Sequence, residues 1–266
     1  MWSFTADVEA YARAAEPFLL SDPVSNTVLL TVLANVRAGM PSEGAFFGWW
    51  TSEGEVRGAA FHTPPHPVGL ARMPVEAIGP LVEALDGAIP EVLGPLDLVG
   101  AVTEALGRPG DVRAERLYRL ETLTPPDVPG RGRPATAADF PLLVSWMQAF
   151  EAEVRLTGAA DMVARVQRRM AAGELFLWDD GAPVALAAVS PQAGGVCRIG
   201  SVYTPRSSRR RGYGAAVTAF VSRTALDERC DEVVLFTDLA NPTSNAIYQS
   251  IGYRPVADYA QVTFTL

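Results

Sequence analysis

The pattern with the clearest chemistry is a run of arginine and glycine residues, Arg209-Arg-Arg-Gly212-Tyr-Gly214-Ala215. It lies between a predicted strand that ends at Thr204 and a predicted helix. Glycine, which has no Cβ, lets a backbone approach a ligand closely. The first amides of a helix have no internal partners, and the helix dipole favours negative charge beside them. Arginines next to those amides add positive charge, so the pattern predicts a binding site for a pyrophosphate group.

Two better-known phosphate-binding patterns do not fit this segment. A dinucleotide-binding fingerprint needs three spaced glycines after the first strand of a βαβ unit, with an acidic residue about 20 positions later. Here the pattern is Arg-x-x-Gly-x-Gly, and it follows a predicted antiparallel hairpin. A Walker loop is excluded because the sequence has no Gly-Lys-Ser/Thr and contains no lysine.

A second pattern follows in the same half of the chain. It reads Asn241-Pro-Thr-Ser-Asn245-Ala-Ile-Tyr248 and ends in Gly252-Tyr253. We predict a short helix over residues 245–251. Asn245 and Tyr248 are three positions apart, so they share one face of that helix.

These two stretches, in this order, resemble the GNAT acyltransferase superfamily over residues 133–266. The resemblance implies that the protein uses acetyl-CoA as an acyl donor and that the strand before the turn pairs with the pantetheine arm. It also implies that Tyr248 is the general acid that protonates the departing thiolate. The predicted cofactor-binding residues are Val202, Tyr203, Thr204, Arg209, Arg210, Arg211, Gly212, Tyr213, Gly214, Ala215, Asn241 and Asn245.

The expected mechanism is direct attack of an amine on the thioester. A backbone N–H of the strand at residues 202–204 can polarise the thioester carbonyl. For the general base we select Glu153, which forms an i, i+4, i+7 row with Trp146 and Phe150 and is expected to have a raised pKa in an apolar stripe. Glu151 is the second choice, and a solvent-exposed Glu153 or an ion pair with Arg155 is the alternative. A Cys–His nucleophile is disfavoured because the domain of Cys197 contains no histidine.

The order of predicted elements occurs twice in the chain, so we expect a duplicated domain. The hairpins at residues 45–62 and 174–189 correspond, as do the segments at residues 91–98 and 232–239, the second of which contains a predicted buried strand at 232–237. We predict a degenerate GNAT-like domain at 1–124, a Pro- and Gly-rich linker at 125–133 and the catalytic domain at 134–266. The fold class is α+β or α/β, each domain having a mixed, mostly antiparallel sheet flanked by helices. The first copy has no arginine and no paired glycines where the second has the predicted anion site.

Composition limits the other possibilities. The net charge of −8 argues against broad nucleic-acid binding, and no apolar run is long enough to span a membrane. The start of the sequence shows no secretory signal, so we expect a cytoplasmic protein. Two cysteines and two histidines do not cluster at metal-ligand spacing, so no metal is predicted.

The sequence leaves the acceptor and the oligomeric state open: the amine can be a small molecule or a peptide N-terminus. Tandem acyltransferases of the mycothiol-synthase type have a similar layout, but nothing here specifies their acceptor. One alternative function is an acyl-CoA-binding sensor without turnover. Another is a FemX-like transferase that uses aminoacyl-tRNA, which the short, acidic chain disfavours.

Overall fold

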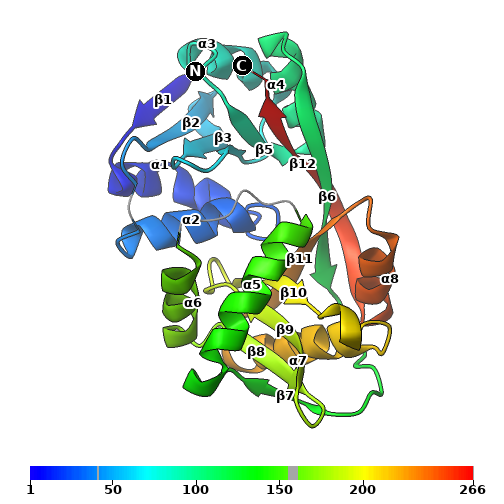
Figure 1. Cartoon of the computed structure of the whole chain (residues 1–266). Coiled ribbons are helices and arrows are strands. Elements are labelled where there is room, and N and C mark those ends of the chain that lie inside the picture. Colours follow the sequence, from blue (N-terminus) through cyan, green and yellow to red (C-terminus); the bar gives the residue numbers. More distant parts are fainter. Residues whose placement is uncertain (41, 155–160, 266) are drawn as a thin grey trace.

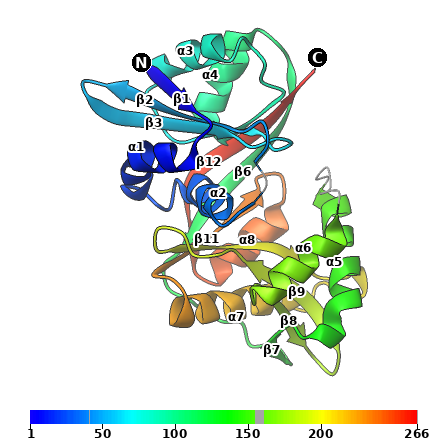
Figure 2. The same cartoon turned by 90° about the vertical axis from the view of Figure 1, so that its left-hand side faces the viewer.

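A single sheet of twelve strands runs through both halves of the protein in the computed structural model, which describes residues 1–40, 42–154 and 161–265 (Figure 1). The strand order is β1-β2-β3-β4-β5-β12-β6-β11-β10-β9-β8-β7. Helices cover both faces, and the two halves of the chain lie one above the other (Figure 2).

The N-terminal half contributes six strands and four α-helices within the described residues. They are β1 (Trp2–Thr5), α1 (Val8–Leu20), α2 (Thr27–Arg37), β2 (Phe46–Ser52), β3 (Glu55–His62), β4 (Val68–Leu70), α3 (Ile78–Ala84), β5 (Glu91–Pro95), α4 (Leu96–Leu106) and β6 (Gly110–Leu120). The segment at residues 91–98 contains β5, which ends at Pro95, and the start of α4 at Leu96.

The C-terminal half repeats this order of elements. It consists of β7 (Arg131–Pro134), α5 (Phe140–Val154), α6 (Met162–Ala171), β8 (Leu175–Asp179), β9 (Pro183–Val189), β10 (Val196–Tyr203), α7 (Tyr213–Glu228), β11 (Glu232–Asp238), α8 (Pro242–Ser250) and β12 (Tyr253–Phe264). Each half thus runs strand, two helices, three strands, helix, strand, helix, strand. This correspondence confirms that the N-terminal half resembles a second copy of the same fold.

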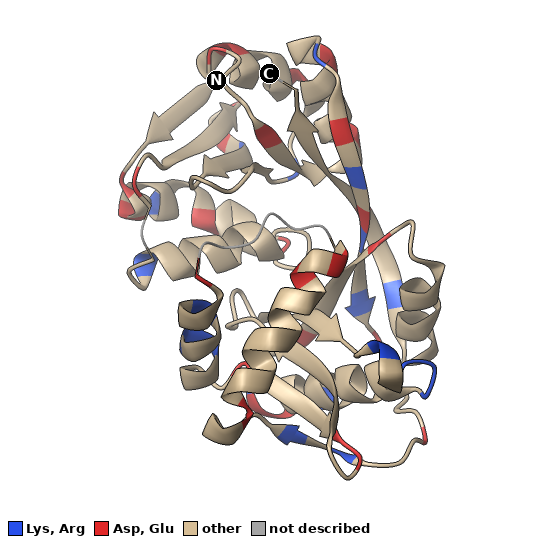
Figure 3. Cartoon of the chain, in the orientation of Figure 1, with Lys and Arg blue, Asp and Glu red and all other residues tan. Residues whose placement is uncertain are grey.

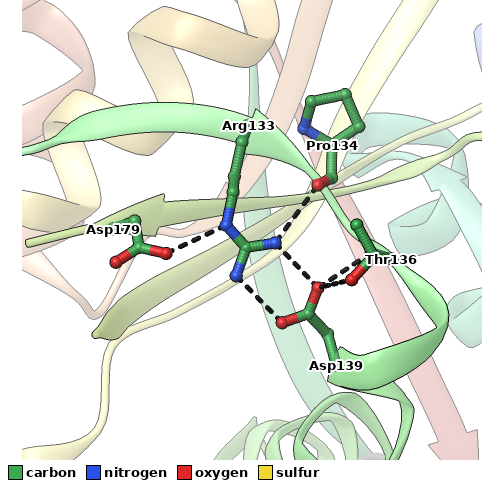
Figure 4. A network of polar contacts seen from close by, with 5 residues as sticks. All are labelled: Arg133, Pro134, Thr136, Asp139 and Asp179. Carbon is green, nitrogen blue, oxygen red and sulfur yellow. Dashed lines mark hydrogen bonds and ion pairs between the residues drawn. The ribbon is translucent and has the colours of Figure 1, made fainter. Parts of the chain in front are cut away.

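The start of α5 is fixed by an Arg133-centred network (Figure 4). Thr136 and Asp139 form a capping box, which satisfies free amides at the helix start. Arg133 of β7 donates to both oxygens of Asp139, at 2.7 and 2.9 Å, and to Asp179 of β8 at 2.9 Å. Because β7 includes residues 131–133, the last part of the predicted linker is an edge strand that holds α5 against the sheet.

The last strands of the two halves are exchanged. β12, from the end of the chain, pairs with β5 of the N-terminal half along residues 259–263. β6, from the N-terminal half, pairs with β11 of the C-terminal half. The two exchanged strands also pair with each other along most of their length and connect the halves (Figure 1). The sheet is therefore not divided at the linker, and the domain boundaries at 124 and 134 stay a prediction about the sequence.

The parallel strands β10 and β11 separate partway along their length. Their ladder runs from Val196↔Glu232 to Ile199↔Leu235 and then ends. One extra residue is inserted in β10 between Gly200 and Tyr203, where Ser201 has φ of 50°. A bulge of this kind bends a strand and re-aims its peptide groups. The second half of β10 thereby has main-chain groups without a partner on β11.

Apolar cores lie on both faces of the sheet in each half. In the C-terminal half, Val217 and Val221 of α7 pack against one face, while Leu143 and Met147 of α5 pack against the other. The N-terminal half has corresponding cores beneath α1 and α2 on one face and α3 and α4 on the other. None of the helices in the described residues is long and apolar enough to cross a membrane.

Candidate active site

The predicted pyrophosphate turn joins β10 to α7 and has an unusual backbone. A short 3-10 helix, η3 (Arg206–Ser208), follows β10. Arg210 and Gly212 then have positive φ angles of 62° and 82°, while Arg211 between them does not. Alternation of φ sign along a turn produces a concave nest of N–H groups, which binds anions. Gly212 is also the N-cap of α7, so this nest continues into the first turn of a helix.

The main-chain N–H groups of this turn have no acceptors in the described part of the chain. The first helical bond of α7 is donated by the amide of Ala216 to the carbonyl of Gly212, at 3.0 Å. The six amides before it donate to no protein acceptor among the described residues. These are the amides of Arg210, Arg211, Gly212, Tyr213, Gly214 and Ala215. Such orphan donors at the positive end of a helix dipole suit a doubly charged phosphate ligand.

The two glycines differ in what they contribute. A Cβ on Gly212 would lie 2.6 Å from Cγ1 of Val128 and would require an unfavourable left-handed backbone. A Cβ on Gly214 would lie 3.4 Å from Oγ1 of Thr204, beside the end of β10. Gly212 therefore permits the turn, while Gly214 keeps open the space between the turn and β10.

The side chains of Tyr203 and Tyr213 support the turn from the protein interior and do not line the predicted anion site. Both side chains are buried, and the hydroxyl of Tyr213 donates to Asp180 in the β8–β9 turn at 2.5 Å. Tyr203 packs against Trp146 of α5, with ring centroids 5.9 Å apart. The contribution we predict from these two residues is therefore through their backbone. Basic residues gather on the loop before α7, at the lower right of Figure 3.

Glu153 does not lie in the apolar stripe that the helix pattern predicted. Its carboxylate is exposed and accepts two hydrogen bonds from Arg209, at 2.6 and 2.7 Å. Arg209 also donates to the carbonyl of Thr204 at 2.8 Å and lies over the ring of Tyr203. The prediction of an apolar environment for Glu153 is thus wrong, because α5 turns this position toward the arginines of the turn. Glu153 instead fixes Arg209 beside the anion site.

The second choice for the base, Glu151, is also committed to an ion pair. It is buried and accepts a short hydrogen bond from Arg165 of α6. Arg155, the alternative partner for Glu153, lies outside the described residues. Both glutamates of α5 thus form ion pairs, and the assignment of either one as the general base stays a prediction.

The second sequence pattern forms α8 and its N-terminal cap. Oδ1 of Asn241 accepts the amide of Ser244 at 3.1 Å, which caps the helix. Asn245 donates to the carbonyls of Asp238 and Asn241, at 2.9 and 2.7 Å. These contacts attach α8 to the end of β11. Both asparagines thus stabilise the local fold. Their role in binding the cofactor stays a prediction.

Tyr248 is half-buried on α8, and its ring packs edge-on against Tyr253 with centroids 6.2 Å apart. Burial raises the pKa of its hydroxyl to about 12. The hydroxyl therefore stays protonated at neutral pH and is able to donate a proton to a stronger base. No hydrogen bond to another described residue engages this hydroxyl.

The first copy of the fold lacks an equivalent anion site. After β4 the chain enters a short 3-10 turn and then α3, whose N-cap Ala77 is right-handed and buried. The segment at residues 73–80, which has no arginine and no paired glycines, therefore also differs in its backbone from the turn of the second copy. Within the described ranges, no three His, Cys, Asp or Glu side chains gather as a metal site requires, and both cysteines are free.

Sequence reasoning missed three polar residues around this region: Tyr118 and Glu115 of β6, and Arg198 of β10. Tyr118 donates to Oδ1 of Asn245 at 2.9 Å, and Glu115 stands opposite Asp238 at the end of β11. Both belong by sequence to the other half of the chain, so no local pattern could place them here. Arg198 is a charged residue within an otherwise apolar strand, and that interruption was the available signal.

Comparison with known proteins identifies the family of this region. The profile of the Acetyltransferase (GNAT) family matches residues 140–253. These residues of the C-terminal half therefore form a domain of the GNAT acetyltransferase family. No curated protein matches the chain.

Solved structures extend the similarity to the whole chain. An acetyltransferase of the GNAT family from Colwellia psychrerythraea aligns over 100% of both chains, with a TM-score of 0.64 and 11% identity. A Drosophila protein aligns over 99% of this chain and 98% of its own, with a TM-score of 0.71 and 15% identity. A tandem GNAT protein from the clavulanic acid biosynthesis pathway aligns over 98% of both chains, with a TM-score of 0.54 and 13% identity. The chain thus has the fold of a tandem GNAT protein.

Proposed function

We propose that this protein transfers the acetyl group of acetyl-CoA to an amine acceptor by direct attack. The observation that carries the proposal is the row of six N–H groups from Arg210 to Ala215, which face no protein acceptor among the described residues. A row of that kind at the N-terminus of a sixteen-residue helix fits the pyrophosphate of CoA.

The rest of the donor would follow the opened edge of β10. Beyond Ile199 this strand has left β11, so the main-chain groups of Val202 and the N–H of Thr204 are available to the amides of a pantetheine arm. The space kept free by Gly214 connects this edge with the turn. Arg209, fixed by Glu153, adds positive charge beside the phosphates.

The chemistry needs few groups. The amine nitrogen attacks the thioester carbon, and a main-chain N–H on the bulged part of β10 stabilises the oxyanion. The carbon–sulfur bond then breaks, and the sulfur leaves with the electron pair and takes a proton from Tyr248. Holding both reactants in one site supplies a large part of the rate gain. No acyl-enzyme intermediate is required.

Titration of the purified protein with CoA, together with release of free thiol from acetyl-CoA in the presence of an amine panel, tests this function. We expect CoA to bind and thiol to appear with at least one small amine or peptide N-terminus. CoA binding without turnover on any acceptor would favour the alternative, an acyl-CoA sensor. Absence of CoA binding would overturn both.

A further inference from the structure

Arg198 of β10 is a half-buried charged residue. Its Nη1 atom is buried and has no hydrogen bond, and its side chain forms no ion pair with any residue in 1–40, 42–154 or 161–265. Burial and the nearby Arg169 lower the pKa of this guanidinium to about 10, so it is charged at neutral pH. A buried N–H donor that has no acceptor costs free energy. The position therefore suits an anion supplied by a ligand.

The location of Arg198 relates it to the proposed reaction site. Its neighbours Cys197 and Ile199 belong to the core beneath α7, so Arg198 lies on the opposite face of β10. Gly200, at the point where β10 leaves β11, is on the same face as Arg198. The two residues are about 6.6 Å apart along the strand, at the usual rise per residue. α2 of the N-terminal half also lies against β10.

An opposite charge lies across β11 on the same face. Glu115 of the exchanged strand β6 is opposite Asp238 on one side and Tyr259 on the other. Its side chain is 20% exposed and pairs with Arg113 at 2.8 Å. Glu115 is the charged residue lining a cavity of about 40 Å³ that is otherwise formed largely by apolar residues of both halves.

The charged and titratable groups facing Glu115 act in different directions. Burial raises the pKa of its carboxyl, and the negative charge of Asp238 acts in the same direction. Arg113 and Arg198 lower that pKa. The strand registers relate the two residues: Arg198 is opposite Val234 of β11 and Glu115 is opposite Asp238, four residues farther along the same strand and on the same face of the sheet.

We propose that the acceptor is a small amine that also carries a carboxylate, such as an amino acid, with its carboxylate on Arg198 and its amine beside Glu115. The inference rests on the proposed function. An acceptor with both charges would place its carboxylate on Arg198 and its ammonium beside Glu115. A simple amine, in contrast, leaves Arg198 without a counter-ion. A carboxylate on the acyl group of the donor would use the same arginine but would leave Glu115 without a role.

Proton transfer balances in this arrangement. The bound ammonium loses one proton to Glu115, which makes the nitrogen lone pair available for attack. After attack the nitrogen loses a second proton. This proton replaces the one that Tyr248 gives to the sulfur, so Tyr248 is protonated again at the end of the reaction. Glu115 afterwards returns its proton to solvent. The products are the amide, free CoA and one released proton.

The test compares amino acids with their amides as acceptors, using acetyl-CoA and the purified full chain. We expect kcat/KM for an amino acid to exceed that of its amide by about tenfold or more, as removal of a charge-assisted hydrogen bond implies. Arg198→Met should abolish this preference, mainly through a higher KM for the amino acid. Arg57→Met, on an exposed arginine of β3, is the matched control and should change neither value.

A binding measurement separates this role from a structural one. In the presence of CoA, amino acids should raise the Tm of the wild-type protein and not that of Arg198→Met. The variant itself should be at least as stable as the wild type, because it removes a buried N–H group that has no acceptor. Glu115→Gln should lower kcat and shift the acidic limb of the pH–rate profile, whereas Arg57→Met should not.

The outcomes also distinguish this inference from the proposed function. Thiol release with amino acids and amides alike, or an unchanged preference in Arg198→Met, would overturn the carboxylate site while leaving acyl transfer intact. Faster reaction with succinyl-CoA than with acetyl-CoA, lost in Arg198→Met, would assign the arginine to the donor and so contradict the acceptor assignment. If neither amino acids nor their amides led to thiol release, that result would count against the proposed function itself.

Discussion

The hydroxyl of Tyr118 donates a 2.9 Å hydrogen bond to Oδ1 of Asn245, and the same hydroxyl accepts one from Nε2 of Gln249 at 3.0 Å. A strand encoded in the N-terminal half thereby holds the helix that carries Tyr248. The orientation of the proposed general acid in one half thus depends directly on the other half. This contact gives the exchange of β6 and β12 a function beyond connecting two domains.

Replacing Tyr118 with Phe removes both bonds without a large change of volume. Asn245 would lose a partner in a half-buried site, so we expect a loss of about 1–3 kcal/mol in the free energy of unfolding. We also expect kcat to fall while the affinity for CoA is retained. Urea denaturation and steady-state kinetics provide the measurements. Tyr259→Phe, which removes a similar bond to the carbonyl of Ser25, is the control, and an equal fall of kcat in both variants would contradict a specific role for Tyr118.

Replacing Tyr248 with Phe tests the general acid. Burial keeps the pKa of Tyr248 near 12, so the hydroxyl is a proton donor throughout the neutral range. Loss of general-acid catalysis should reduce kcat by about 100-fold or more, with little change in the dissociation constant of CoA. Stopped assays of thiol release and calorimetry measure the two quantities. If kcat were unaffected, the thiolate would have to leave without help from this residue.

Replacing Glu153 with Gln distinguishes a positioning role from the predicted base. Because Glu153 is paired with Arg209, we expect the KM for acetyl-CoA to rise several-fold, as for loss of one charge-assisted contact. The value of kcat and the pH–rate profile should be unchanged. A large fall in kcat together with loss of the acidic limb of that profile would restore Glu153 as the base.

Replacing Gly212 with Ala tests the anion-binding turn, and Gly54 offers a control with nearly the same backbone. Both glycines have φ near 80°, at 82° and 81°, but only Gly212 has a neighbour in the way of a new Cβ. The left-handed conformation should cost each variant roughly 1–2 kcal/mol of stability. Gly212→Ala should in addition weaken CoA binding by about tenfold, since 1.4 kcal/mol corresponds to that factor. Equal CoA affinities in the two variants would contradict the assignment of this turn.

Asp139 gives a prediction for acid stability. Hydrogen bonds from Arg133 hold the pKa of this carboxyl well below its usual range, and those from Thr136 act in the same direction (Figure 4). The folded protein therefore binds this proton less readily than the unfolded chain. The resulting stability is fully present above the unfolded pKa of about 3.9 and is lost as the pH falls below it.

Asp139→Asn should accordingly reduce the free energy of unfolding by about 1.5–3 kcal/mol near neutral pH, the usual range for hydrogen bonds to charged groups. The difference between wild type and variant should shrink in acid. Denaturation curves at several pH values measure this, with Asp97→Asn as an exposed control. A constant difference across the pH range would show that the Arg133 pair is not responsible.

Several parts of this molecule could be predicted from local sequence. The turn at 209–215 was recognisable because glycine spacing and arginine charge act over a few residues. The hairpin predicted at residues 174–189 is present as β8 and β9. The helices α1 and α2 were not predicted, although their apolar faces now form the core with Tyr11 and Leu33.

By itself the sequence determined the repeated order of elements, the presence of one anion-binding turn and the family of the second half, because each depends on short-range backbone chemistry. Only the tertiary structure decided which strand lies beside β11, and therefore that Tyr118 and Glu115 reach the second half. It also decided that Glu153 pairs with Arg209 and that Arg198 is half-buried without an ion-pair partner among the described residues. These outcomes depend on strand pairing and helix rotation between distant segments, which no local periodicity specifies.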